Sequence, residues 1–362
     1  MPTIRPDRNN GVKPMNASAK LALWLLLGLL CGRAFALDAK PQAAKRLFLW
    51  KATSKNNSVV YLLGSIHVGD RNFYPLPDEI ENAFADSKDL VVEVDLTKVG
   101  ADAVQGALMT KGTYENGGSV SDHLPKPVVQ KLRNYFDRKG VPLEALEQFR
   151  PWALAITITQ LEMESLGYQA PLGIDKHFMD KAGDRKIVEL ESAGGQIDLL
   201  SGLPEEQQAA FLASTVDTAE QTKELMEKTV AMWKTGDAAG MDKLLLRDQL
   251  KERPELKPVF AKLIDERNEK MATKIAALEG EGPHFVVVGA AHLIGAKGVV
   301  KLLEKKGYRV EQVSRAAGPG KAGVAAKGAG DKTKPSKPGQ PAEPERKAPA
   351  KSGYAPAGSW DK

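Results

Sequence analysis

Apolar runs near both ends of the chain are followed by polar turns and then by helical patterns. In the first part, apolar runs at 46–52 and 58–64 enclose the polar stretch 54–57, whose residue types are typical of a hairpin turn. Apolar residues then recur at helical spacing over 79–86, and an apolar run follows at 89–95. The first part of the chain therefore predicts a hairpin, a loop, a helix and a further strand.

The middle of the chain, from 97 to about 280, has a mainly helical pattern. Helices are expected over 127–139, 143–147, 151–166, 204–233, 237–249 and 254–279, and one short strand is expected over 186–191. The apolar run 285–288 precedes an expected helix over 296–306 and a strand over 308–313, so the order of the first part is repeated. We predict an α/β (α+β) fold in which a mixed central sheet is assembled from both ends of the folded chain, and the helical insertion forms a cap.

Two of the apolar runs end in a Gly-x-x-His motif, the first from Gly64 to His67 and the second from Gly289 to His292. Glycine lets the chain turn sharply after a buried strand. A histidine three residues later is then held near the carboxyl end of that strand, where α/β proteins bind ligands. We expect the two imidazoles to face one another across one pocket, as metal ligands or as acid-base groups. The alternative is that each ring only hydrogen-bonds its own turn.

Carboxylates lie near the ends of the expected strands. Glu93 interrupts an apolar strand, where an unpaired carboxylate is costly, so it is a candidate metal ligand or general base. The alternative is an edge strand with Glu93 in solvent. Asp95 lies nearer the end of the strand and could act instead, and Glu191 ends the short strand 186–191 in a similar place. The alternative role for Glu191 is to cap the helix expected after Ser192.

Two arginines could act beside these carboxylates. Arg150 precedes a proline, and Arg267 lies in an expected helix among acidic residues. An arginine at such a site holds a substrate carboxylate or stabilises an oxyanion, although a surface ion pair is the common alternative. His123, His177 and His284 have no paired motif, and we expect them to be structural.

These motifs together resemble the TraB/PrgY/GumN family. The resemblance extends over about residues 45–314, and besides the two Gly-x-x-His motifs it involves the segments 91–95, 150–152, 173–175, 190–192 and 266–268. It implies a superfamily shared with Tiki proteases, erythromycin-esterase-like enzymes and ChaN-like haem-binding lipoproteins. Membership of such a superfamily restricts the fold more than the substrate.

The resemblance to the metal-dependent Tiki peptidases implies that His67, Glu93 and His292 hold a divalent metal ion such as Mn, Co or Zn. The expected function is a metal-dependent hydrolase that acts on peptides or proteins. In it, Glu191 or Asp95 takes a proton from the bound water, and Arg150 or Arg267 orients the substrate. The expected supporting residues are Gly64, Gly289 and Asp175. Two alternatives are a non-catalytic protein that binds a peptide, a signal or haem, and a metal-free His/Glu hydrolase like the esterase relatives.

The N-terminal sequence has the pattern of a signal peptide. A basic lead precedes the apolar run 21–30, and a small-x-small pattern ends at Ala36, so residues 1–36 are expected to be removed, with Met15 as an alternative start. A retained anchor or lipidation at Cys31 are the alternatives. The apolar run is too short to span a bilayer. We therefore expect a periplasmic or secreted protein with no cysteine in its mature form and no transmembrane span after cleavage.

Residues 315–362 are rich in Ala, Gly, Pro and Lys, so this segment is expected to be a disordered tail. The tail carries a net charge of +6 and residues 1–36 carry +4, which leaves −5 on residues 37–314 of a chain whose net charge is +5. The high isoelectric point therefore comes from the two ends, and nucleic-acid binding by the domain is not expected. The tail either contacts anionic envelope components or keeps the protein soluble.

Overall fold

The computed structural model describes residues 46–316, apart from 100, 116 and 279–281. The predicted signal peptide lies outside the described residues, as does the predicted tail beyond Ala316. Within the part of the chain that is described, no helix has the length and apolar character needed to cross a membrane.

A six-stranded sheet forms the centre of the described chain. Its strands are β1 (Arg46–Thr53), β2 (Val59–Ser65), β3 (Asp89–Val92), β4 (Ile187–Glu189), β5 (His284–Gly289) and β6 (Arg309–Ser314). Their order in space is β4, β3, β5, β2, β1, β6. The neighbours from β4 to β2 are parallel, and β1 is antiparallel to both β2 and β6. The predicted mixed sheet built from both ends of the folded chain is therefore confirmed.

Helices account for most of the insertion between β3 and β5. The helices of the insertion are α3 (Ala101–Lys111), α4 (Lys126–Arg138), α5 (Pro151–Ser165), α6 (Ile174–Asp180), α7 (Ala193–Ser201), α8 (Glu205–Thr218), α9 (Thr222–Thr235), α10 (Ala238–Asp242), α11 (Asp248–Glu252), α12 (Lys257–Phe260) and α13 (Glu266–Ala276). Outside it, α2 (Asp78–Ala85) precedes β3, and α14 (Ala290–Leu293) and α15 (Val299–Lys305) follow β5. The helices predicted over 204–233, 237–249 and 254–279 are interrupted, whereas the one predicted over 151–166 is continuous as α5. A 3-10 turn at Ala219–Gln221 separates α8 from α9, and π turns at Lys243–Arg247 and Ala261–Asp265 interrupt the other two.

Two other predictions needed correction. The helix expected over 143–147 is only a 3-10 turn at Leu143–Ala145, where Pro142 precedes the turn. Strand β3 ends at Val92, so Glu93 lies just beyond the strand and not within it. Because β3 lies between β4 and β5, and Glu93 is only 2% exposed, the edge-strand alternative for this carboxylate is wrong.

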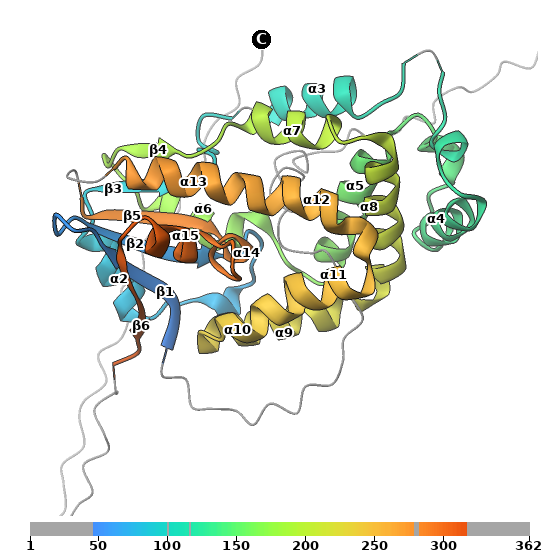
Figure 1. Cartoon of the computed structure of the whole chain (residues 1–362). Coiled ribbons are helices and arrows are strands. Elements are labelled where there is room, and N and C mark those ends of the chain that lie inside the picture. Colours follow the sequence, from blue (N-terminus) through green and yellow to red (C-terminus); the bar gives the residue numbers. More distant parts are fainter. Residues whose placement is uncertain (1–45, 100, 116, 279–281, 317–362) are drawn as a thin grey trace, which may run out of the picture. The chain divides into compact units, whose positions relative to one another are not determined.

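Helices cover both faces of the sheet (Figure 1). On one face, Phe84 of α2 and Phe178 of α6 contact Phe285 of β5, with ring centroids 5.4 and 4.8 Å away. Helices α13 and α15 lie on the other face. The carboxyl ends of the parallel strands β2, β3, β4 and β5 meet at one edge of the sheet, and α5, α8, α9 and α12 stand beyond that edge. Both Gly-x-x-His motifs are thereby brought to the side of the sheet that the insertion covers.

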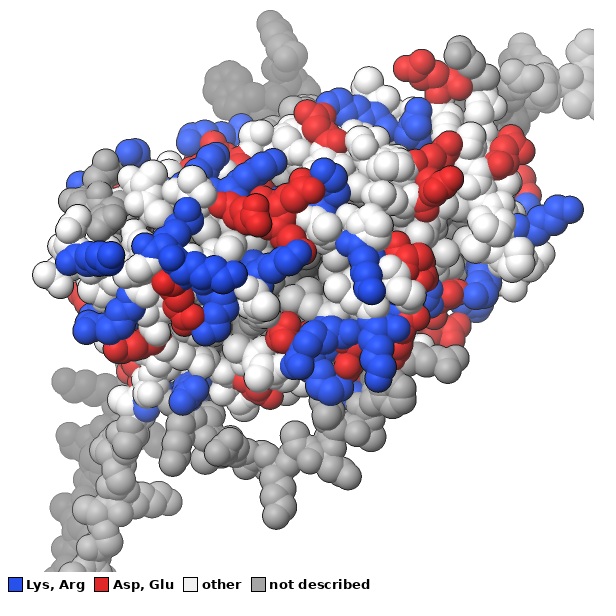
Figure 2. Space-filling model, in the orientation of Figure 1, with Lys and Arg blue, Asp and Glu red and all other residues white. Residues whose placement is uncertain are grey.

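Basic and acidic side chains are interspersed on the face shown in Figure 2. Surface side chains of the described residues also form ion pairs, for example Lys297 with Asp265 at 2.7 Å and Lys262 with Glu266 at 2.9 Å. Exposed pairs of this kind contribute little to stability. The described part of the face shown in Figure 2 therefore has no large area of a single charge.

Candidate active site

His67 lies two residues past the end of β2, and its ring is oriented by a helix of the insertion. The distance between His67 Nδ1 and Asp175 Oδ1 is 3.0 Å. An ionised carboxylate only accepts hydrogen bonds, so Nδ1 carries the hydrogen and Nε2 is the unprotonated nitrogen of the neutral ring. The hydroxyl of Ser65 also donates to Asp175 Oδ1, at 2.5 Å, and accepts from the Asp175 backbone N–H at 3.2 Å. The first turn of α6 therefore fixes which nitrogen of His67 faces the site.

The second histidine has a neutral partner instead of a charged one. His292 Nδ1 lies 2.5 Å from Asn268 Oδ1, and Asn268 Nδ2 donates to the carbonyl of Lys297 at 2.9 Å. The second bond fixes the orientation of the amide, so Nδ1 of His292 is the donor. Among the described residues, His292 Nε2 has no hydrogen-bond partner, although the side chain is fully buried. The ring therefore presents a buried lone pair to the site.

The two imidazoles differ in their affinity for protons. Burial lowers the pKa of His67, but the charge and the hydrogen bond of Asp175, together with Glu93, outweigh burial and raise that pKa above its usual value. Burial, followed by the charges of Arg267 and His67, holds the pKa of His292 well below its usual value. His292 is thus neutral at neutral pH, whereas His67 gains a proton more readily.

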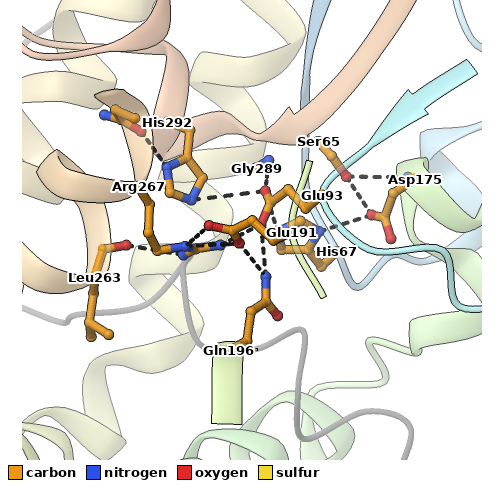
Figure 3. Close-up of polar contacts among 11 residues, drawn as sticks. Ser65, His67, Glu93, Asp175, Glu191, Gln196, Leu263, Arg267, Gly289 and His292 are labelled. Carbon is orange, nitrogen blue, oxygen red and sulfur yellow. Dashed lines mark hydrogen bonds and ion pairs between the residues drawn. The ribbon is translucent and has the colours of Figure 1, made fainter. Parts of the chain in front are cut away.

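Glu93 lies between the two rings (Figure 3). Its Oε1 is 3.9 Å from Nε2 of His67 and 3.9 Å from Nε2 of His292. The same oxygen accepts the backbone N–H of Gly289 at 2.6 Å, while Oε2 accepts from Arg267 Nη2 at 2.8 Å. One carboxylate oxygen therefore faces both Nε2 atoms, and it is fixed by the backbone of the second motif.

At both motif glycines, neighbouring atoms lie too close to leave room for a side chain. A Cβ at Gly289 would lie 2.8 Å from His67 Nε2 and 3.3 Å from Glu93 Oε1. A Cβ at Gly64 would overlap the ring of Phe48. The space between His67 and Glu93 is thus kept clear by the absence of a side chain at position 289.

His67, Glu93 and His292 form a cluster together with two charged residues, Glu191 and Arg267. Arg267 is 4% exposed, and its Nε donates to Glu191 Oε1 at 2.8 Å and Oε2 at 3.0 Å. Its Nη2 donates to Glu191 Oε2 at 2.5 Å, and its Nη1 donates to the carbonyl of Leu263 at 3.0 Å. Although burial opposes ionisation, hydrogen bonds from Arg267 and Gln196 lower the pKa of Glu191. Glu191 and Glu93 therefore share one buried guanidinium.

Two residues expected at the site lie elsewhere. The carboxylate of Asp95 accepts from Thr97 at 2.6 Å and pairs with Lys98 at 3.0 Å, and within the described chain it does not contact the two histidines or Glu93. Arg150 donates to the carbonyl of Thr113 at 3.2 Å, and its guanidinium lies over the ring of Tyr114, 4.8 Å from its centroid. Neither contact leads to the cluster.

The three remaining histidines also pair away from the site. His123 lies 3.0 Å from Glu205, His177 lies 3.1 Å from Glu81, and His284 lies 3.4 Å from Asp89. Sequence reasoning gave no role to Ser65, Asn268 or Gln196. Asn268 directly follows the candidate Arg267, and this adjacency weakly indicates a role at the site. A glutamine in the first turn of a helix gives no such indication.

The donor atoms suit a divalent ion, but they are too far apart to hold one as they stand. Among the residues that the structure describes, no group of three or more His, Cys, Asp or Glu side chains is arranged to hold a metal ion. Donors that share one tetrahedral ion lie about 3.4 Å apart, compared with 3.9 Å between each Nε2 and Glu93 Oε1. The buried lone pair of His292 and the clear space at Gly289 nevertheless fit a cation beside Glu93.

Comparisons with known proteins agree with the motifs. The sequence model of the TraB/PrgY/gumN family matches residues 48–312. YbaP of Escherichia coli is 24% identical over 261 residues, which is 71% of this chain and 93% of that protein. Metalloprotease TIKI1 of Danio rerio is 24% identical over 323 residues, which is 75% of this chain and 64% of that protein. Metalloprotease TIKI1 of Homo sapiens is 24% identical over 331 residues, which is 76% of this chain and 63% of that protein.

No solved structure matches the chain. Since the family match extends over most of the sequence, this chain belongs to the TraB/PrgY/gumN family.

Proposed function

We propose that this protein is a periplasmic or secreted hydrolase that acts on peptides or proteins, and that His67, Glu93 and His292 hold a divalent ion such as Mn, Co or Zn. The observation that carries the proposal is that Nε2 atoms from two distant motifs lie at the same 3.9 Å from one carboxylate oxygen. The names of the TIKI1 relatives support a metalloprotease activity. The leader pattern in residues 1–36 supports export.

A divalent ion at this place supplies a Lewis acid and lowers the pKa of a bound water. The protein's own groups prepare the ligands. Asp175 and Asn268 hold the Nδ1 atoms, so that both Nε2 atoms present lone pairs to the site. Arg267 holds Glu93 through Oε2 and leaves Oε1 facing the histidines.

The expected role of Glu191 changes in this proposal. Both of its oxygens accept hydrogen bonds from Arg267, and its pKa is lowered, so it is a weak base. We propose that Glu191 orients Arg267 and does not take the proton from water. Asp95, which contacts Thr97 and Lys98, has no part in the proposed reaction.

A metal-free hydrolase is the second candidate, and the proton affinity of His67 favours it. The pKa of this ring is raised by Asp175 and Glu93 despite burial, as suits a general base. In that reaction His67 would accept a proton from water while Asp175 stabilises the resulting imidazolium. Resistance of the activity to chelators would select this candidate.

The experiment is metal analysis of the purified protein, combined with cleavage of a peptide library before and after chelation. His67→Ala and His292→Ala should lose both bound metal and cleavage while circular dichroism shows the fold retained. His123→Ala is the matched control, because that histidine pairs with Glu205 away from the cluster. Equal metal content in the wild type and in all three variants would refute the proposed metal site. A Soret band on titration with haem, lost in His67→Ala, would instead identify a haem-binding protein.

A further inference from the structure

Gln196 lies in the first turn of α7, and its amide has only one possible orientation. The Nε2 atom donates to Glu191 Oε2 at 2.9 Å and to Glu93 Oε2 at 3.4 Å. Carboxylate oxygens only accept, so a flipped amide would place an oxygen against two negative groups. The nitrogen of Gln196 is therefore fixed toward the carboxylates and its oxygen is fixed away from them, as Figure 3 shows.

The oxygen of this amide is a hydrogen-bond acceptor that the described protein does not use. Gln196 is 8% exposed, and within the described residues its side chain makes the two bonds to carboxylates and none through Oε1. This oxygen is not among the fully buried side-chain atoms without a partner, so solvent reaches it. A bound molecule with an N–H group at this place would displace that solvent and pair with Oε1 directly.

The other side-chain amide of the cluster cannot take this role. Asn268 uses its oxygen for His292 and its nitrogen for the carbonyl of Lys297. Gln196 instead contacts Glu93, the carboxylate that faces both histidines, and leaves its own oxygen without a hydrogen bond to any described residue. A group bound to this oxygen would therefore lie beside the proposed reaction centre.

We propose that Gln196 Oε1 accepts a hydrogen bond from an N–H of the substrate backbone, and that it selects amides over esters. This inference rests on the proposed function, because it assigns the substrate class of the same site. An ester has an oxygen where the amide has its N–H, so its lone pairs would face those of Oε1. A site built to bind an N–H group discriminates strongly against an analogue that lacks it. Gln196 would thus distinguish a peptidase from the esterase-like alternative.

The test uses equilibrium binding, so that it does not depend on turnover. The probes are acetyl-tetra-alanine amide and its analogues with one ester replacing each peptide bond in turn, titrated into the full-length protein by calorimetry. One ester position should weaken binding about 5- to 100-fold, the equivalent of one unpaired buried acceptor. Gln196→Met keeps the length of the side chain without its acceptor, and it should bind that ester and the amide with equal affinity.

Gln208→Met is the matched control, since Gln208 is also a buried helical glutamine, at 2% exposed, but donates to the carbonyl of Leu203. It should keep the wild-type preference for the amide. Equal binding of amide and ester probes by the wild type, the same preference in Gln196→Met, or no binding of any probe at millimolar concentration would overturn the inference. Loss of the metal or of cleavage in the earlier experiment would leave these affinities unchanged, so the two proposals fail separately.

Discussion

The substitution Gly289→Ala tests the proposed cation position with a single methyl group. The Cβ would lie 2.8 Å from His67 Nε2 and 3.3 Å from Glu93 Oε1, in the space where a cation is proposed. Gly289 has φ −51° and ψ 138°, which alanine adopts without strain, so the backbone itself does not oppose the change. The destabilising part of the effect therefore comes from the contact with His67 and Glu93.

The size of that effect follows from how firmly the neighbours are held. A contact of 2.8 Å is well inside an ordinary van der Waals distance, and the His67 ring is fixed by its bond to Asp175. Overpacking of a buried site costs about 1–3 kcal/mol, and the reduced entropy of the unfolded chain returns about 0.4–1 kcal/mol. We expect a net loss of about 1–2 kcal/mol in the free energy of unfolding, together with loss of metal binding.

The assays are urea denaturation and calorimetric titration with Zn or Mn. Gly106→Ala in α3 is the control, because a Cβ there meets nothing within 4 Å. That control should gain about 0.5–1 kcal/mol from helix propensity and bind metal normally. If Gly289→Ala instead unfolds and binds metal like the wild type, the placement of the cation beside Glu93 is refuted.

Three further predictions concern the partners of the site. Asp175→Asn should lower the pKa of His67, measured by imidazole NMR. In the wild type the raised pKa contributes stability that is present at low pH and is lost as the pH rises through it, so the variant should lose this contribution. Asn268→Leu leaves the Nδ1 hydrogen of His292 unpaired, so urea denaturation should show a loss of about 1–3 kcal/mol and NMR a mixture of tautomers. An unchanged tautomer would contradict the role of this amide. Arg267→Lys loses the paired hydrogen bonds to two carboxylates and should cost about 3 kcal/mol, while a cost below about 1 kcal/mol would show that the buried ion pair is dispensable.

The pH dependence of stability should also carry the signature of His292. Its pKa is held well below the ordinary value, so below about pH 6.5 the unfolded chain takes up a proton at this position that the folded protein does not. The free energy of unfolding should therefore fall as the pH decreases through that range. Urea denaturation of the wild type and His292→Ala measures the difference, and parallel curves would contradict the assigned direction.

Glu93 and Asp95 show how far the sequence pattern alone predicts which residues lie at the site. Glu93 and Asp95 are two positions apart and both lie beyond an apolar run. The sequence pattern singled out both, but β3 ends at Val92, and the turn that follows directs Asp95 toward Thr97 and Lys98. The direction of a side chain in such a turn depends on its local contacts and not on strand periodicity.

The sequence also did not show which of the two candidate arginines lies at the site. Only Arg267 is buried among carboxylates, because α13 packs across the sheet near the ends of β3 and β4. Arg150 instead lies just before α5, at its N-cap position, and contacts Tyr114. Gln196 contacts Glu191, 5 positions away, and Glu93, 103 positions away, and no periodicity or motif indicates either contact.

The local order of residues by itself determined most of the strands and helices, and that a histidine follows the glycine-terminated end of two buried strands. These properties depend on periodicity and on backbone freedom, which act over a few residues. Only the tertiary structure decided that β2 and β5 are parallel neighbours, with Leu63 opposite Val287, so that both imidazoles reach one carboxylate. Tertiary contacts also decided which nitrogen of each ring is exposed to the site, because Asp175 and Asn268 come from separate helices of the insertion. Packing of helices far apart in sequence sets these contacts, and no local pattern encodes them.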